Sequence, residues 1–520
     1  MNRIFINALI IIVSSLLLNT VGISFRVFIS NKIGTEGMGL FQLIFSVYMM
    51  AILFVVTGIN VAVTRLVAEE GGRSSYLAAR AVIIKAFSLS FLFSTPAFLF
   101  LFYGAEQIGT AWLGDPRTIL PLKLLAAGLP FAGISACVKG YFYAVGRLIR
   151  PTGSQALELA IQIAITIGIL DYFMSGGPEY ACAAVALGVT ISEIAACMYN
   201  LTLYRFDPSR TENRLTHGTR RPGSVRKLLQ ISLPISASSL IRTGLKAMEN
   251  IMIPIGFERY GYAKKIALQE YGKIHGMVIP VLMFPSTVIL AFSALLIPEM
   301  SEANALNQKK RIEYSVVRSL QLTSFMSILI AGFFFFYSQK LGSAIYNSDD
   351  CGVLMKALAP LIPLIYLDIV SDELLKGLNQ QMNVLRYNIT DAAIKIVMIA
   401  YAVPGHGLSG LIFVLYVSGF INCAFNIRRL LIITGVRLKA GEWLLKPLLS
   451  AAVSGLAATL LTDLAAPDYF NDTAYIVVGA IIICLIYFTF LVMIGCLTKD
   501  DLKWLRSVFH HEKTGQNPGA

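Results

Sequence analysis

Residues 26–40 read RVFISNKIGTEGMGL and follow about two dozen residues that are nearly all apolar. Arg26 falls inside this apolar run, and Lys32 follows it together with the glycines Gly34, Gly37 and Gly39. A helix needs about 20 apolar residues to span a bilayer, and this run is long enough to do so. The stretch therefore predicts a first membrane-spanning helix that carries a cation and is followed by a tight, glycine-rich turn.

The composition indicates the same environment for the whole chain. Of its 520 residues, 56% are hydrophobic and only 14% are charged. Soluble domains average roughly 45–50% apolar and about 25% charged residues. The apolar residues form continuous runs and do not alternate with polar ones as they would in a membrane barrel, so helices are expected to span the membrane. The sequence predicts an all-α polytopic membrane protein.

The hydrophobic runs predict about 14 transmembrane helices. No segment between them is long enough to hold a soluble domain, so function is expected in the membrane or in short loops. The predicted helices cover residues 4–29, 38–67, 76–103, 118–145, 151–175, 180–204, 229–256, 270–298, 313–338, 353–378, 383–403, 407–432, 441–463 and 473–496.

The distribution of positive charge predicts the orientation. Lys and Arg are retained on the cytoplasmic side of a membrane. Most of the 43 Lys and Arg residues lie in the even-numbered connections and the two tails, above all in residues 205–228. Both termini are therefore predicted to be cytoplasmic. The net charge of +13 then reflects topology and contact with anionic headgroups, and we expect no nucleic acid partner.

Metal and redox chemistry find no support in the sequence. The seven cysteines are scattered without a CxxC pair, and the five histidines are dispersed. Neither a metal site nor a disulfide framework is predicted. We expect no cofactor.

An internal repeat organises the chain. Residues 39–69 and 272–302 have equal length and similar ends, and Lys139-Gly140 recurs as Lys376-Gly377 at nearly the same separation along the chain. Six helices separate the copies, so the repeats are parallel. The predicted organisation is two six-helix lobes with two C-terminal helices: an N-terminal lobe 1–205, a basic cytoplasmic linker 206–228, a C-terminal lobe 229–432, two additional helices 433–498 and a cytoplasmic tail 499–520.

Charged residues inside the spans mark the candidate substrate site. Such residues cost roughly 2.5–3.5 kcal/mol each on insertion scales, so we expect them to face water or a partner. In the helix 229–256 they recur at helical spacing on one face. The alternative is a satisfied intrahelical Lys246–Glu249 pair, with Arg26 reaching the interface. The predicted substrate-binding residues are Arg26, Arg242, Lys246, Glu249, Asn250, Glu158, Gln162, Asp391 and Lys395.

The first connection and its cytoplasmic counterpart supply candidate gating or hinge residues. The glycines of this connection are expected to provide a tight turn and close helix contact; no strand precedes them, which excludes a phosphate-binding loop. The predicted gating residues are Lys32, Gly34, Gly37, Gly39, Arg65 and Glu69.

Several stretches resemble a known family. They are residues 26–40, GINVAVTRLVAEEGGR at 58–73, KGYFYAVGR at 139–147 and LLIPEMSEA at 295–303. With the length and helix number, they are similar to the stage V sporulation protein B family, in the polysaccharide and lipid II flippase branch of the multidrug/oligosaccharidyl-lipid/polysaccharide flippase superfamily. The resemblance implies two six-helix lobes, a central cavity and alternating access.

The resemblance also implies a substrate and a set of residues. Arg26, Lys32 and Gly34 match a functional pattern of lipid II flippases, whereas Thr20 stands where those flippases have a further Arg. Their basic residue at the start of helix eight has no certain match; Lys273 and His275 are nearest. The implied function is movement of an undecaprenyl-diphosphate-linked precursor, lipid II for peptidoglycan or spore cortex, across a bacterial cell membrane. The implied partners are this lipid-linked glycan, the bilayer and the cell-wall synthesis machinery.

Other functions remain open at this point. They are a flippase for another lipid-linked polysaccharide unit, a multidrug cation antiporter and a non-transporting membrane scaffold. A membrane-embedded glycosyltransferase would need a catalytic carboxylate in a large external loop, and the external connections offer only Glu106, Asp115 and Glu258. We therefore do not expect an enzyme. Without a nucleotide-binding motif, the membrane potential or an ion gradient is the expected driving force, and the coupling ion is unknown.

Overall fold

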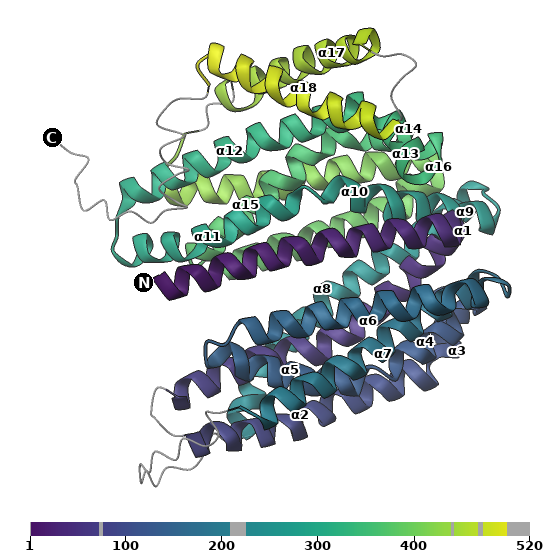
Figure 1. Cartoon of the computed structure of the whole chain (residues 1–520), viewed down its shortest axis with the longest axis vertical. Coiled ribbons are helices and arrows are strands. Elements are labelled where there is room, and N and C mark those ends of the chain that lie inside the picture. Colours follow the sequence, from purple (N-terminus) through teal and green to yellow (C-terminus); the bar gives the residue numbers. More distant parts are fainter. Residues whose placement is uncertain (1, 72–75, 208–224, 438–440, 466–471, 497–520) are drawn as a thin grey trace. The chain divides into compact units, whose positions relative to one another are not determined.

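The computed structural model describes residues 2–71, 76–207, 225–437, 441–465 and 472–496 (Figure 1). These residues form helices and connections, with no strand among them. The chain is an all-α polytopic membrane protein, as predicted. Residues 208–224 of the predicted linker and all of the predicted tail lie outside the described residues.

Each predicted transmembrane helix has a helical counterpart in the described part of the chain. The first two join in α1 (Asn2–Gly71), which is kinked at Gly34, and the eleventh and twelfth join in α16 (Gln381–Thr434), which is kinked at Gly407. Gly34 has a φ of 71° and Gly407 a φ of 57°, values that favour glycine. The predicted breaks are therefore sharp kinks between helices rather than loops.

Ten helices in the described residues are long and apolar enough to cross a membrane, or up to eleven if a bent pair is one span. This number is below fourteen partly because α1 and α16 each count once. The helices between these two elements have the following bounds: α2 (Tyr76–Tyr103), α3 (Ala105–Gln107), α4 (Ile119–Ala126), α5 (Leu129–Ala144), α6 (Ile149–Met174), α7 (Pro178–Arg205), α8 (Val225–Tyr260), α9 (Lys264–Tyr271), α10 (Ile279–Met283), α11 (Ser286–Ala305), α12 (Lys309–Phe336), α13 (Ser338–Tyr346), α14 (Asp349–Leu358) and α15 (Ile362–Gly377). After α16 follow α17 (Lys446–Ala465) and α18 (Asp472–Met493).

The predicted helix 270–298 is interrupted. Helix α9 continues into a π-helical stretch, η4 (Gly272–Val278), and then into α10, before Pro285 begins α11 as its N-cap. Proline lacks a backbone N–H and cannot continue the hydrogen-bond ladder of a helix, which accounts for a break at Pro285. The result is a segmented span.

The chain forms two compact units. The N-terminal unit comprises Met1–Met277 with Lys395–Leu411, and the C-terminal unit comprises Val278–Ile394 with Ile412–Ala520. Packing places α8 and α9 in the N-terminal unit, although the repeat assigns their sequences to the second lobe. The lobe boundaries drawn from the repeat remain a prediction, because the repeat concerns similarity between sequence segments, whereas the compact units are defined by how the helices pack.

Glycines set the helix contacts inside the N-terminal unit. Helix α1 packs against α8, α5, α2 and α9. A Cβ added at Gly39 would lie 2.2 Å from the Leu268 carbonyl oxygen, and one at Gly272 would lie 2.1 Å from the Thr35 carbonyl oxygen. Further along α1, a Cβ at Gly58 would lie 2.3 Å from the Ser232 carbonyl oxygen. Only glycine allows the backbones to approach this closely.

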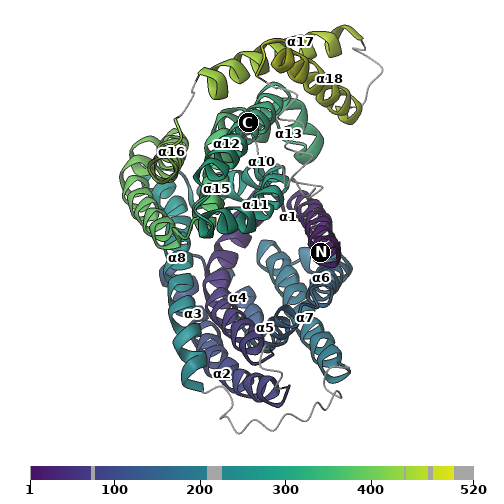
Figure 2. The same cartoon turned by 90° about the vertical axis from the view of Figure 1, so that its left-hand side faces the viewer.

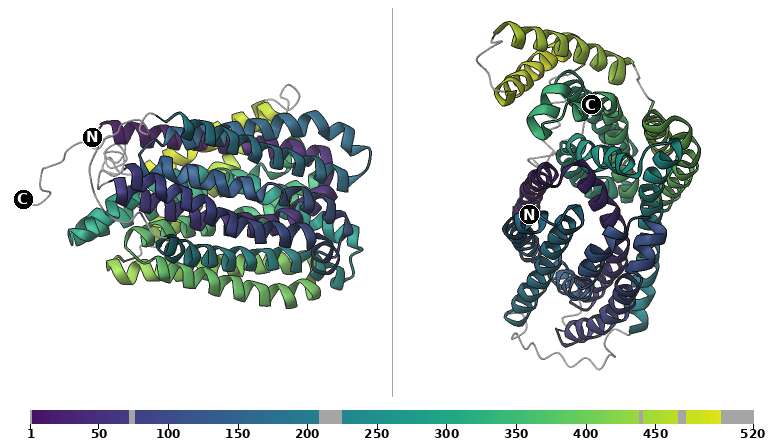
Figure 3. Two further views of the ribbon diagram at one scale, coloured as in Figure 1. Left: turned by 90° about the horizontal axis from the view of Figure 1, so that it is seen from below. Right: turned by 90° about the vertical axis from the view of Figure 1, so that its right-hand side faces the viewer.

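The C-terminal unit contains a matching contact. Helix α15 packs against α11 and α12, and α17 packs against α18, a pair seen side by side in Figures 2 and 3. In the N-terminal unit the Thr64 hydroxyl donates to the Gly140 carbonyl at 3.1 Å; in the C-terminal unit the Ser301 hydroxyl donates to the Gly377 carbonyl at 3.1 Å. Thr64 and Ser301 are as far apart along the chain as Gly140 and Gly377, so the two contacts are equivalent in the register of the Lys-Gly pairs, which differs by four residues from the register that aligns 39–69 with 272–302.

Candidate functional site

Three charged side chains from two distant parts of the chain meet inside the N-terminal unit. Lys246 and Glu249 lie on α8, with Lys246 Nζ 2.9 Å from Glu249 Oε1. Lys395 of α16 lies with its Nζ 3.8 Å from the same carboxylate oxygen. We call Lys246, Glu249 and Lys395 the cation cluster. Its two ammonium groups share one carboxylate, which gives the three residues a net charge of +1.

The burial of the three groups differs. The Glu249 side chain is only 3% exposed and that of Lys395 is 17% exposed, whereas 54% of the Lys246 side chain is exposed. The intrahelical Lys246–Glu249 pair expected as the alternative therefore exists, but it does not neutralise the cluster because Lys395 adds a second cation. Two ammonium groups held close together suit an anionic ligand.

Buried polar groups surround the cation cluster. Asn250 is 3% exposed and His275 is 7% exposed, and the Tyr271 and His275 rings lie 5.1 Å apart. Within the described residues, Asn250 Oδ1, His275 Nε2 and the Tyr271 hydroxyl have no hydrogen-bond partner. Buried polar groups are normally paired, so these three are available to water or a ligand. His275 interacts electrostatically with Glu249 and both lysines.

The other predicted substrate-binding residues are dispersed over four helices. Arg26 is half-buried on α1 and Arg242 is exposed on α8. Gln162 is half-buried on α6, where Glu158 pairs with Lys139 of α5 at 3.2 Å. Asp391 lies one helical turn before Lys395 on α16 but belongs to the C-terminal unit, where it accepts a hydrogen bond of 2.7 Å from Ser418.

The predicted gating residues fall into two groups. Gly34 forms the kink of α1, and Gly39 contacts the backbone of α9. A Cβ at Gly37 would lie 3.0 Å from the Ile33 side chain, in its own helix turn. The charged members form exposed ion pairs, Lys32 with Asp171 at 2.9 Å and Arg65 with Glu69 at 3.0 Å. Such exposed pairs contribute about 0–1 kcal/mol to stability.

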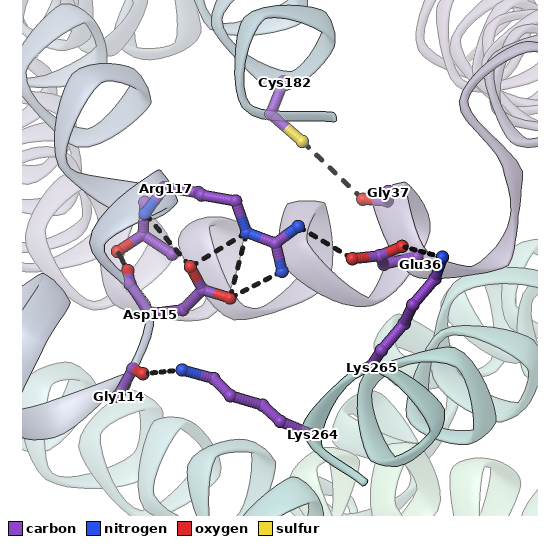
Figure 4. A network of polar contacts seen from close by, with 9 residues as sticks. Glu36, Gly37, Gly114, Asp115, Arg117, Cys182, Lys264 and Lys265 are labelled. Atoms are coloured by element: carbon purple, nitrogen blue, oxygen red, sulfur yellow. Dashed lines mark hydrogen bonds and ion pairs between the residues drawn. The ribbon is translucent and has the colours of Figure 1, made fainter. Parts of the chain in front are cut away.

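Sequence reasoning missed an ion-pair network beside the α1 kink (Figure 4). Arg117 donates to Glu36 at 2.7 Å and, through two nitrogens, to Asp115 at 2.8–3.2 Å. Lys265 lies 3.8 Å from Glu36, and Lys264 donates to the Gly114 carbonyl. We call Glu36, Asp115, Arg117, Lys264 and Lys265 the kink network. It joins α1, the connection before α4 and the start of α9, and short-range sequence patterns carry no sign of it.

The ionisation of Asp115 reflects its two neighbours. Burial disfavours the charged carboxylate, but hydrogen bonds from the Arg117 side chain and backbone outweigh this effect, and the pKa of Asp115 is lowered. Asp115 also accepts from the Arg117 backbone N–H as the N-cap of a short 3₁₀ turn, Pro116–Thr118. The carboxylate is therefore ionised at neutral pH and holds the arginine in place.

The described residues contain no group of three or more His, Cys, Asp or Glu side chains arranged to hold a metal ion. The seven cysteines are free, and six of them are buried.

Comparison with known proteins gives matches at the level of sequence. A family model described as polysaccharide biosynthesis protein matches residues 4–304. Stage V sporulation protein B of Bacillus subtilis (strain 168) is 24% identical over 409 residues, which is 77% of this chain and 78% of that protein. Sporulation protein YkvU of the same organism is 20% identical, over 64% of this chain and 73% of that protein.

Solved structures share the fold. The lipid II flippase MurJ in an inward closed conformation matches with a TM-score of 0.65 at 13% identity, over 93% of this chain and 98% of that one. An inward-facing multidrug resistance MATE family transporter matches with a TM-score of 0.63 at 13% identity, over 81% of this chain and 96% of that one. At this identity the likeness concerns the fold.

Proposed function

We propose that this chain, which belongs to the polysaccharide biosynthesis protein family, is a flippase for an undecaprenyl-diphosphate-linked cell-wall precursor. The first candidate substrate is lipid II, for peptidoglycan or spore cortex. The protein would move it from the inner to the outer leaflet of a bacterial cell membrane by alternating access, with both termini in the cytoplasm. The enzymes that make and polymerise the precursor are the expected partners.

The convergence of two ammonium groups on one buried carboxylate carries this proposal. Two lysines from α8 and α16 converge on a nearly buried glutamate, whose single negative charge is shared between them. A diphosphate offers several anionic oxygens, each able to accept a charge-assisted hydrogen bond from an ammonium group. An organic cation, the substrate of a multidrug antiporter, would be repelled by the same cluster. Arg26 and Arg242 supply further positive charge on α1 and α8.

The driving force follows from the charge of the substrate. The cytoplasm is negative, so outward movement of an anion is favoured by about 2.3 kcal/mol per charge per 100 mV. The exposed Lys246 would make the first contact with the headgroup, and the half-buried Lys395 would make a deeper one. The lipid tail would remain in the bilayer while the headgroup passes.

The test is transbilayer movement in proteoliposomes containing the purified full-length protein. Lipid II and a non-peptidoglycan undecaprenyl-diphosphate glycan are compared, using wild type and the variants Lys246→Ala and Lys395→Ala. Lys340→Ala is the matched control, because Lys340 forms an exposed ion pair with Asp472 in the C-terminal unit. We expect lipid II movement that both cluster variants lose and the control retains.

The other outcomes assign other functions. Movement of only the second glycan would identify a flippase for another lipid-linked polysaccharide. Movement of neither lipid by a folded protein would contradict the proposal. In that case, efflux of an organic cation would identify an antiporter, and its absence would identify a scaffold.

A further inference from the structure

We propose that a second charge cluster in the N-terminal unit, Glu158 and Glu193 with Tyr48 and Lys139, is a proton-binding site that couples the flippase to a proton gradient. The coupling rests on the function proposed above, whereas proton binding does not. We call these four residues the carboxylate cluster. They come from α1 (Tyr48), α5 (Lys139), α6 (Glu158) and α7 (Glu193), all within one compact unit.

The cluster contains one carboxylate with a cation and one without. Lys139 Nζ lies 3.2 Å from Glu158 Oε2, so this pair is compensated. Glu193 is 8% exposed and, among the described residues, forms neither a hydrogen bond nor an ion pair. It interacts electrostatically with both Glu158 and Lys139. With both glutamates and Lys139 ionised and the Tyr48 phenol neutral, the cluster would carry a net charge of −1 inside a membrane-spanning bundle.

An uncompensated charge in this position is costly. Ionised side chains at membrane depth cost about 2.5–3.5 kcal/mol on insertion scales, and nearby like charges oppose joint ionisation. Uptake of one proton by Glu193 removes this surplus charge. The exchange is balanced as Glu193 carboxylate plus hydronium giving the neutral carboxylic acid plus water. The cluster then alternates between charges of −1 and 0.

A buried hydroxyl points to the same exchange. Tyr48 is 1% exposed, its hydroxyl has no hydrogen-bond partner in the described residues, and it interacts electrostatically with both glutamates. A phenol can donate a hydrogen bond to a carboxylate and accept one from a carboxylic acid. The Tyr48 hydroxyl can therefore form a hydrogen bond with Glu193 or Glu158 in either protonation state, because it is not already hydrogen-bonded to another described residue.

The remaining groups around Glu193 leave its charge uncompensated. Cys197, on the same helix, interacts with both Glu193 and Lys139, and Tyr143 of α5 interacts with Lys139. Both are neutral near neutral pH. In the turn between α4 and α5 the neighbour of Glu193 is Gly128, which has no side chain. In the described residues Lys139 is thus the one cation that interacts with Glu193, and it already forms an ion pair with Glu158.

A proton fits this cluster better than a metal cation does. Hard cations require about six or more oxygen ligands, several of them carboxylates or carbonyls. Here Lys139 occupies Glu158, and the described residues contain no group of three or more metal-binding side chains. A proton needs a single carboxylate oxygen and an acceptor or donor beside it.

Infrared spectroscopy of the full-length protein in lipid tests the proton site without reference to transport. The probe is the carbonyl stretch of a protonated carboxylic acid, followed while the pH is raised in sodium-free buffer. We expect a band that disappears with rising pH in wild type and is absent in Glu193→Gln. Glu193→Asp should retain a titrating band, and Glu179→Gln, an acidic residue in the first turn of α7, should leave the band unchanged.

Two results would overturn the proton site. One is an identical band in wild type and Glu193→Gln. The other is loss of the band on adding sodium at constant pH, which would indicate a metal cation instead.

Coupling is tested separately, by measuring flipping with and without an imposed pH gradient. We expect a gradient-dependent rate in wild type and a gradient-independent rate in Glu193→Gln. A titrating band with gradient-independent wild-type flipping would overturn the coupling alone, and no flipping at any gradient would contradict the proposed function instead.

Discussion

The two copies of the repeat share a backbone contact but differ in charge. Thr64 with Gly140 and Ser301 with Gly377 form the same hydrogen bond at equivalent positions of the two copies. In the same alignment Glu158 corresponds to Lys395, so one copy places a carboxylate in the carboxylate cluster where the other places an ammonium group in the cation cluster. The repeat retained the helix packing and reversed the polarity of this position.

The polar cores of the copies differ in a similar way. In the N-terminal unit Asn200 donates to the hydroxyls of Ser135 and Ser154 at 2.7 and 2.8 Å. The positions that correspond to these serines are Asp372 and Asp391, in the C-terminal unit. There the amides of Asn422 and Asn426 donate to Asp368 at 2.8 Å, and Asn426 also donates to Asp372 at 3.3 Å. Neutral hydroxyls in one copy are thus replaced by carboxylates in the other.

The largest effect, a loss of lipid II flipping, is expected when the charge difference between Glu158 and Lys395 is removed. Lys395→Glu would give both copies a carboxylate at this position and change the cation cluster from +1 to −1. A carboxylate at this position would repel the diphosphate that the ammonium group attracts, so we expect lipid II flipping to fall by about two orders of magnitude or more. Flipping in proteoliposomes measures it, with Lys340→Glu as the control. Unchanged flipping would remove the cation cluster from the mechanism.

The contribution of the shared backbone contact to the free energy of unfolding can be compared between the two copies by replacing Gly140 or Gly377 with alanine. A Cβ at Gly140 would lie 2.8 Å from the Asn60 carbonyl oxygen, whereas one at Gly377 would lie 3.3 Å from the Ile297 carbonyl oxygen and 2.9 Å from the Met300 side chain. We expect Gly140→Ala to lose about 1–3 kcal/mol and Gly377→Ala less, because the new methyl group meets a backbone oxygen at 2.8 Å at Gly140 but meets no backbone atom closer than 3.3 Å at Gly377.

Thermal unfolding in detergent measures both variants. Gly22→Ala is the matched control on α1, since no atom lies within 4 Å of its added Cβ. Equal losses at Gly140 and Gly377 would show that the two contacts are mechanically equivalent despite their different geometry.

The polar cores give a smaller difference. Asn200→Leu leaves two serine hydroxyls, which we expect to cost about 0.5–1.5 kcal/mol, whereas Asn426→Leu withdraws donors from two aspartates and should cost about 1.5–3 kcal/mol. Unfolding midpoints in the same detergent report the order. A larger loss for Asn200→Leu would contradict the interpretation that charge makes the C-terminal core more dependent on its donors.

The smallest expected effect is on the pH dependence of stability. It concerns the residue that caps the connection after the third predicted transmembrane helix of each copy. Asp115 caps this connection in the N-terminal unit, whereas Ser348 caps α14 in the other. The lowered pKa of Asp115 means that its ionised form stabilises the fold fully above the unfolded-state value of about 3.8, and that this stability is lost as the pH falls below it.

We therefore expect the unfolding midpoint of wild type to exceed that of Asp115→Asn at pH 6 to 7. The difference should begin to shrink below about pH 3.8 and vanish only at a pH below the lowered folded-state pKa, where the carboxylate is protonated in both the folded and the unfolded state. Ser348→Ala, which lacks an ionisable cap, should differ from wild type by the same amount at every pH. A constant difference for Asp115→Asn would exclude the carboxylate charge as the cause.

Much of the fold could be predicted from the sequence. Apolar runs of membrane length indicated the helices, because a lipid environment leaves the backbone no alternative to internal hydrogen bonds. The repeated Lys-Gly pairs located a contact that both units contain. The glycines after residue 33 indicated close packing, and Gly39 indeed contacts α9. What the runs could not show is that Gly34 and Gly407 kink continuous helices, since a kink and a short loop have the same composition.

Only part of the candidate site could be predicted from the sequence. Helical spacing placed Lys246 and Glu249 on one face of α8, because residues three apart are neighbours on a helix. That Lys395 would join them, from a helix much later in the chain, depends on how α16 packs in the N-terminal unit. The same holds for Arg117 and Glu36, and for Glu193, whose lack of a cation is visible only once its neighbours are known. From the amino-acid order alone one can say which side chains are charged and which helices carry them. Packing in three dimensions fixes which of those charges meet, because electrostatic energy depends on distance in space and not on separation along the chain.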